Sequence, residues 1–159
     1  MATRAPLWAL GLFAAMFCAA SAWLGADASW DFRNYHLYDG HAALAGTLWR
    51  DIAPAQLQSF YPPLLDVGPF VVRRALNAHP TALAMLLALP YALAAWLALR
   101  VALRVGLPLG VAVLAVLLGA TGAAGLPTLG TAMSEAVPGC LVLGALGMVC
   151  RTPPPTPSR

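Results

Sequence analysis

Residues 5–26 read APLWALGLFAAMFCAASAWLGA, a stretch without a charged side chain between Arg4 and Asp27. As an α-helix, these roughly 22 residues would extend about 33 Å, which is enough to cross the hydrocarbon core of a bilayer. The stretch therefore predicts a transmembrane helix. A basic residue before it and the Ala-Ser-Ala run at 20–22 also fit an alternative, a cleaved signal peptide.

Three further apolar runs predict transmembrane helices at about 81–99, 107–126 and 131–150. The chain is 60% hydrophobic and 9% charged, with a mean hydropathy of +0.75, whereas soluble domains carry about 25% charged residues. These figures exclude ordinary soluble and disordered proteins. We therefore predict an all-α integral membrane protein, a single membrane domain of residues 1–159 with about four transmembrane helices.

The positions of the arginines predict the orientation of these helices. All nine basic residues are Arg, and the pI is about 9.1. If the helices alternate, Arg4, the Arg100/Arg104 loop and the Pro-rich tail at 151–159 share one side, which the positive-inside rule assigns to the cytoplasm. The first loop, residues 27–80, then lies outside. Because arginines border the apolar runs, we interpret them as topology signals and expect no nucleic-acid partner.

The first loop concentrates the polar chemistry of the chain. Residues 27–74 hold five of the six acidic residues, four of the nine Arg, two of the three His and three of the four Tyr. A simple connection between helices needs only a few residues, so this loop is the candidate functional region. Apolar residues at helical spacing in 35–49 predict a short interfacial helix, and 64–72 is expected to return toward the membrane.

The segment WDFRNYH at 30–36 places Asp31 at the outer membrane surface. Partial desolvation at such a boundary raises the pKa of a carboxyl group, which suits a general base. Arg33 is suited to clamp a phosphate. Alternatively, Trp30 and Tyr35 only anchor the loop among the lipid head groups, and the charges are solvated. The residues alone leave both interpretations open.

Further candidate substrate contacts lie along the loop. Residues 51–63 offer amides and a phenol, groups that bind sugars, or form a rigid Pro-bounded surface loop. Arg73 and Arg74 fit either a lipid phosphate or simple snorkelling to the membrane surface. Glu135, the only Glu, is an acid near a membrane helix and is a default candidate contact. The predicted substrate-binding residues are Asp27, Arg33, Asn34, Tyr35, His36, Gln56, Tyr61, Arg73, Arg74 and Glu135.

A metal site is not predicted. His36, Asp39 and His41 carry metal-binding atoms, but their spacing matches no strong metal motif. No cofactor motif, such as a Gly-rich phosphate loop, is present either.

Three segments carry a family resemblance: WDFRNYH at 30–36, DIAPAQLQ at 51–58 and FYPPL at 60–64. Together they resemble the bacterial multi-pass glycosyltransferases of the GT-C type, nearest to the glycosyltransferase 87 (DUF2029-like) group. GTAMSE at 130–135 resembles a later loop of the same family, and the resemblance covers roughly 5–150. Members of that family are much longer and have more spans, so the resemblance implies the N-terminal part of such an enzyme, apparently truncated.

The resemblance implies sugar transfer from a polyprenyl-phosphate donor to an acceptor at the outer face of the bacterial inner membrane. The lipid-linked donor is a substrate, and no other cofactor is implied. Asp31 matches the family's general base, with Asp27 as the reserve position, and Arg33 or the Arg73/Arg74 pair would stabilise the departing phosphate. The alternative is a non-catalytic small membrane protein, an accessory subunit or transporter whose polar loop binds a partner.

Overall fold

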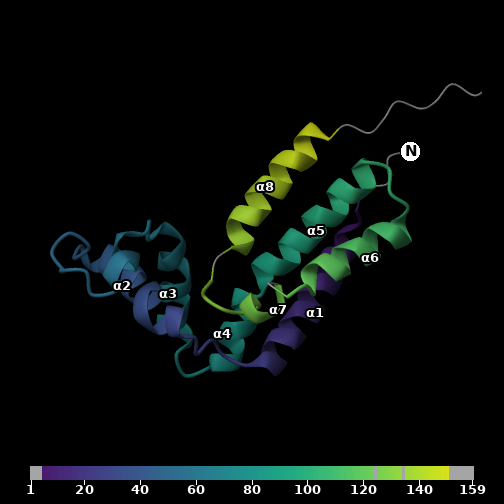
Figure 1. The fold of residues 1–159 in the computed structure, drawn as a ribbon. Helices are drawn as coiled ribbons and strands as arrows, with labels where there is room; N and C mark the ends of the chain where they lie inside the picture. The colour runs from purple at the N-terminus through teal and green to yellow at the C-terminus, as the bar shows by residue number, and fades with distance from the viewer. Residues whose placement is uncertain (1–4, 124, 134, 151–159) are drawn as a thin grey trace, which may run out of the picture.

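The computed structural model describes residues 5–123, 125–133 and 135–150. Within these residues the regular structure is entirely helical, so the all-α prediction is confirmed. Figure 1 shows a bundle of long helices and, beyond one end of it, a smaller unit in which α2 and α3 lie side by side. We call residues 27–79, which form this smaller part, the polar unit. The elements are α1 (Leu7–Leu24), η1 (Phe32–His36), α2 (Leu37–Ala45), η2 (Gln56–Phe60), α3 (Leu64–Leu76), α4 (Pro80–Leu87), α5 (Leu89–Arg104), α6 (Leu109–Ala120), α7 (Gly125–Thr128) and α8 (Ala136–Val149).

Two helical stretches in the described part of the chain are long and apolar enough to cross a membrane. They are α1, with 18 residues, and the nearly continuous pair α4–α5, with 25 residues from Pro80 to Arg104. Both fall on predicted spans, at 5–26 and 81–99. Pro80 is the first residue of the second stretch, where the backbone N–H that proline lacks would have no partner within the helix.

The other two predicted spans are shorter than expected. The span predicted at 107–126 is helical in α6 for 12 residues, about 18 Å, and that predicted at 131–150 is helical in α8 for 14 residues, about 21 Å. A bilayer core is about 30 Å thick. Helix α6 ends where Thr121 and Gly122 interrupt the run of good helix formers. Four full-length spans are therefore not established by helix length.

Small residues on α5 allow close packing at the centre of the bundle. Helix α5 contacts α1, α6 and α8. Along α4–α5 the buried positions recur at helical spacing, and they pack against the aromatic side of α1. The buried set includes Ala9, Phe13, Phe17, Ala88, Ala92, Ala95, Leu99 and Leu103. The indole Nε1 of Trp96 donates to the carbonyl oxygen of Pro6 at 3.2 Å and joins α5 to the start of α1.

The outward faces of the bundle are apolar as well. Trp23 on α1 is 85% exposed and Met148 on α8 is 80% exposed, and Leu12, Leu118 and Leu141 also point outward. Extended exposed apolar surfaces mark contact with a membrane or a partner. The exposed faces and the two long apolar stretches together favour membrane association.

The polar unit is held together by a close crossing of α2 and α3. A Cβ atom at Gly40 would lie 2.6 Å from Cβ of Phe70 and 2.8 Å from the carbonyl oxygen of Asp66, so only glycine permits this approach. The helix predicted within 35–49 is present as η1 and α2 and ends at Gly46. Residues 64–72, which are expected to return toward the membrane, form the first part of α3, and their position relative to a membrane stays a prediction.

A second close approach brings the segment that precedes α8 onto the ends of α1 and α4. Gly130 has a φ of +73°, and a Cβ atom there would overlap the Ser21 hydroxyl and lie 2.9 Å from the carbonyl oxygen of Ala84. Nearby, the Asp27 carboxylate accepts a hydrogen bond from the Ala132 N–H at 3.1 Å. Gly130 and Ala132 are thereby placed beside the end of α1 and the start of the polar unit.

Candidate functional site

The polar unit gathers aromatic rings and carboxylates from distant parts of the sequence. The Tyr35 ring is half-buried, lies edge-on to the Tyr61 ring with centroids 6.0 Å apart, and is 4.2 Å from the His36 ring. Burial raises the pKa of the Tyr35 phenol, and the nearby charges of Asp31, Asp66, Tyr61 and Glu135 raise it further. Predicted residues from the first loop and from the start of α8 thus share one neighbourhood. We call Asp31, Tyr35, Tyr61 and Glu135 the aromatic–carboxylate cluster.

The side chain of His36 forms an ion-pair contact across the polar unit. Its Nδ1 lies 2.6 Å from Oδ1 of Asp66 on α3, and both side chains are mostly buried. Burial by itself lowers the pKa of His36, but the hydrogen bond and the charge of Asp66, with smaller effects of Asp31 and Asp27, outweigh it, so the pKa is raised. His36 therefore joins η1 to α3 rather than facing solvent.

Asp39 is the most unusual carboxyl group in the polar unit. It lies on α2 and is fully buried, and neither of its oxygens has a hydrogen-bond partner among the described residues. Burial, and then the charge of Asp66, raises its pKa to about 6, against a smaller opposing effect of His36. The buried Nε2 of His36 also has no partner within that part of the chain. Asp39, Asp66 and His36 together form a buried proton-binding group between α2 and α3.

Sequence reasoning did not select Asp39 or Asp66 as site residues. Asp39 was considered only as a weak metal ligand, and Asp66 only as one of the loop acids. One signal in the sequence for the burial of Asp39 is that it directly precedes Gly40. A glycine at which two helices cross closely also brings its neighbours in the chain into the interface. The partner helix could not be identified from that signal alone.

Two of the predicted contacts have structural roles. Asp27, the reserve base, accepts hydrogen bonds from the N–H groups of Ser29 at 2.9 Å and of Ala132 at 3.1 Å. Its carboxylate therefore connects the loop after α1 to the loop before α8. The amide of Asn34 donates to the carbonyl oxygen of Trp30 at 2.7 Å. Both groups are therefore engaged within the fold.

The predicted cations are spread around the unit. The guanidinium of Arg73 lies 4.7 Å from the ring centre of Phe32, and that of Arg74 lies 6.0 Å from the ring centre of Phe70. Arg33 and Gln56 are exposed. Arg73 is held against the buried Phe32, next to the cluster segment, whereas Arg33 remains free to reach toward a ligand.

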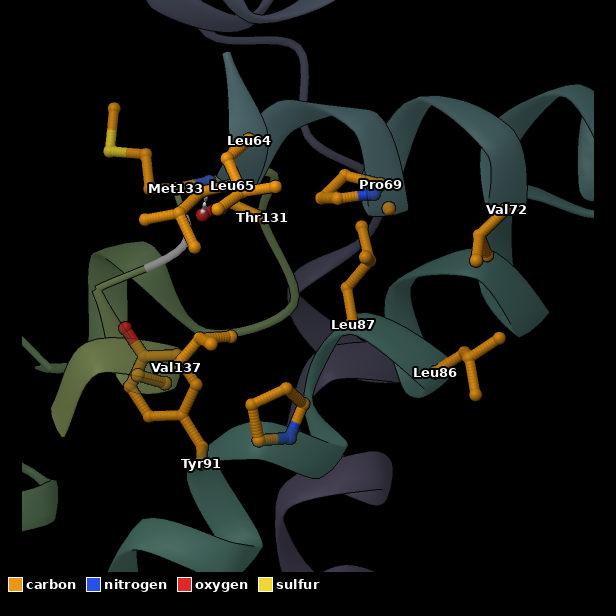
Figure 2. A pocket seen from close by; sticks show the side chains of 13 residues that line it. Leu64, Leu65, Pro69, Val72, Leu86, Leu87, Tyr91, Thr131, Met133 and Val137 are labelled. Atoms are coloured by element: carbon orange, nitrogen blue, oxygen red, sulfur yellow. Dashed lines mark hydrogen bonds between the residues drawn. The ribbon is translucent and has the colours of Figure 1, made fainter. Parts of the chain in front are cut away.

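An apolar cavity of about 340 Å³ lies between α3 of the polar unit and the helices α4 and α5. Its lining includes Leu64, three residues after Tyr61 of the aromatic–carboxylate cluster, and Ala136, the residue after Glu135. Figure 2 shows Leu64 and Pro69 of α3, Leu87 of α4 and Tyr91 of α5 around the same space, with Met133 at its edge. The cavity separates the polar unit from the bundle. It therefore offers an apolar surface next to a polar site.

The described residues contain no group of three His, Cys, Asp or Glu side chains placed to hold a metal ion. The ring of His41 packs against that of Phe70, with ring centres 5.8 Å apart. His41 is not part of the buried proton-binding group of His36, Asp39 and Asp66. Comparisons with protein families, with curated proteins and with solved structures give no match.

Proposed function

We propose that this chain is part of a membrane glycosyltransferase that moves a sugar from a polyprenyl-phosphate donor to an acceptor at the outer face of the bacterial inner membrane. The observation that carries the proposal is the aromatic–carboxylate cluster next to an apolar cavity. Tyrosine rings offer stacking faces for a sugar, and carboxylates accept hydrogen bonds from its hydroxyl groups. The apolar cavity suits the first isoprene units of the donor, since binding sites for lipids need apolar walls.

In this proposal Asp31 is the general base. It lies close enough to Tyr35 for its charge to affect the phenol, and it is half-buried. Its carboxylate takes the proton of an acceptor hydroxyl, the hydroxyl oxygen forms the new bond to the anomeric carbon, and the bond to the phosphate oxygen breaks with inversion. The departing polyprenyl phosphate carries the negative charge away, and Arg33 or the Arg73/Arg74 pair stabilises it.

The membrane topology belongs to the same proposal. Helices α1 and α4–α5 cross the membrane, and the shorter α6 and α8 complete four spans with their flanking residues. The N-terminus is cytoplasmic and the polar unit lies outside. The acids of the polar unit and Glu135 then share the outer surface, where a lipid-linked sugar presents its head group.

The exchange of Asp31 for Asn tests the catalytic role. Membranes containing the chain are incubated with radiolabelled undecaprenyl-phosphate hexoses, and label transferred to acceptor material is measured. Because Asn keeps the shape and removes the base, we expect Asp31→Asn to lower transfer by 10²-fold or more, a typical contribution of a general base. The matched control is Asp51→Asn, an exposed acid that accepts a hydrogen bond from Tyr38. Equal transfer by the two variants at equal abundance would contradict the assignment.

A second candidate function, a partner-binding accessory protein, has one specific observation in its favour. In the segment after α2, Ile52 is 96% exposed and Trp49 is 91% exposed, and Leu57 is exposed as well. Exposed apolar side chains on an otherwise polar unit are typical of contact surfaces. Under this alternative, replacing Trp49 and Ile52 with Ser would abolish binding of the chain to its partner, while Asp31→Asn would leave that binding unchanged.

A further inference from the structure

A separate positively charged cavity lies at the end of the bundle away from the polar unit. Arg100 and Arg104 are one helical turn apart on α5, both half-buried, and line a cavity of about 290 Å³ between α5 and α8. On the α8 side the wall is formed in part by Gly144 and Gly147, which have no side chains to fill the space. A Cβ atom at Gly147 would lie 3.6 Å from Nη1 of Arg104. Figure 1 shows that the final turns of α5 and α8 are at the same end of the bundle, far from α2 and α3.

The two guanidinium groups have no counter-charge in the described part of the chain. Arg100 lies over the Trp96 ring at 4.7 Å from its centre, and neither arginine forms an ion pair there. All six acidic residues of the sequence lie between 27 and 66 or at 135, toward the other end of the bundle. Like charges one turn apart on a helix repel each other, and the repulsion grows where water is excluded. An anion between the two side chains would remove this cost.

We propose that this cavity binds the phosphate group of an anionic membrane phospholipid. Guanidinium groups match phosphate oxygens with paired hydrogen bonds. The glycines leave room for the head group, and the remaining walls, Leu97, Leu143 and Met148, are apolar and suit acyl chains. The Trp96 ring packs against the guanidinium of Arg100, and tryptophan is a residue type that is enriched at membrane interfaces.

The source of the phosphate is a lipid and not a soluble anion, because the cavity lies among apolar side chains. Met148 at its edge is 80% exposed, so the cavity borders an outward apolar face of α8 and not a polar surface. The arginine positions place this end on the cytoplasmic side, where anionic lipids attract basic residues. This proposal goes beyond the proposed sugar transfer, and of the proposed function it rests only on the orientation of the helices in the membrane.

Native mass spectrometry of the full chain in detergent tests the site, with dioleoyl phosphatidylglycerol as the probe and dioleoyl phosphatidylcholine as the neutral reference. Each arginine near an anionic surface contributes about 1 kcal/mol, or about fivefold. We therefore expect the double variant Arg100→Gln/Arg104→Gln to lose about 25-fold in preference for phosphatidylglycerol, fivefold for each arginine. The matched control, Arg50→Gln, removes an exposed arginine of the polar unit that has no proposed ligand contact, and should keep the preference.

A third variant separates the cavity from the charge. Gly147→Leu keeps both arginines but fills the space beside Arg104, and should also lose the preference. A preference unchanged in Arg100→Gln/Arg104→Gln, or lost equally in the Arg50→Gln control, would overturn the proposal. If Gly147→Leu keeps the preference for phosphatidylglycerol, the lipid is attracted by the charge of the arginines alone and does not enter the cavity, which would overturn the cavity assignment. Displacement of phosphatidylglycerol by millimolar inorganic phosphate would assign the site to a soluble anion instead.

Discussion

Replacing Asp39 with Asn isolates the buried carboxyl group between α2 and α3. In the folded polar unit, this group has no hydrogen-bond partner among the described residues and no exposed surface. Asn has nearly the same shape as a protonated Asp and cannot ionise. The exchange therefore removes the titration of this position while preserving its packing.

The magnitude follows from the pKa of Asp39, which is raised from 3.8 to about 6 in the folded chain. The folded state therefore binds this proton more tightly than the unfolded state. The stabilisation is complete below about pH 4 and is lost as the pH rises through about 6. At about 1.4 kcal/mol per pKa unit, the loss between pH 4 and pH 8 is about 3 kcal/mol. The pKa of His36 is also raised, so its contribution is lost in the same direction as the pH rises through its folded pKa.

Hydrogen exchange of the α2 and α3 amides, corrected for the intrinsic rate at each pH, measures the free energy of opening of the polar unit. We expect the wild-type free energy to fall by about 3 kcal/mol or more from pH 4 to pH 8. Asp39→Asn should match the wild type at pH 4 and exceed it at pH 8. The control Asp51→Asn changes an exposed acid and should stay within about 0.5 kcal/mol of wild type. A wild-type value that is flat or rises with pH, or an Asp39→Asn variant that is less stable than wild type at pH 8, would refute this reasoning.

Two further predictions concern the glycine contacts that position the site. Gly40→Ala should destabilise the polar unit by about 1–3 kcal/mol in the same exchange experiment, because the new methyl group meets Phe70, while Gly11→Ala, which meets no atom within 4 Å, should not. Gly130→Ala should lower the melting temperature of the chain in detergent because its methyl group overlaps the Ser21 hydroxyl and its φ is positive. The double variant Ser21→Ala/Gly130→Ala should recover part of that loss, and no recovery would show that the overlap is not the cause.

The long apolar helices could be predicted because the signal for them is local. Uninterrupted apolar sequence between charged residues is sufficient to indicate α1 and the α4–α5 pair. The observed stretches Leu7–Leu24 and Pro80–Arg104 correspond to the predicted spans 5–26 and 81–99, and the second extends five residues further than predicted. The lengths of α6 and α8 were overestimated. Hydropathy continues through Thr121 and Gly122 and through the segment around Gly130, but helical backbone geometry does not, since glycine and threonine disfavour helix continuation. Apolar character and helix length are separate properties of a sequence.

The candidate site was only partly predictable. The concentration of acids, tyrosines and histidines in 27–74 indicates a candidate region, and within it the rings of Tyr35, His36 and Tyr61 lie together. The burial of Asp39 depends on which helix crosses α2 at Gly40, which is a long-range property that local patterns do not contain. The same limit applies to the hydrogen bond that the Asp27 carboxylate accepts from the Ala132 N–H, because it joins residues 105 positions apart.

The most direct test of the central proposal is whether a polyprenyl-phosphate sugar binds at the aromatic–carboxylate cluster. A photoreactive benzoylphenylalanine is placed at position 61, beside Tyr35, or at the control position 38, where Tyr38 contacts Asp51 instead. Membranes are illuminated with radiolabelled undecaprenyl-phosphate hexose, and label on the chain is measured. We predict labelling at position 61 that excess unlabelled donor removes, and little labelling at position 38. Equal labelling at both positions, or none at position 61, would contradict the proposal.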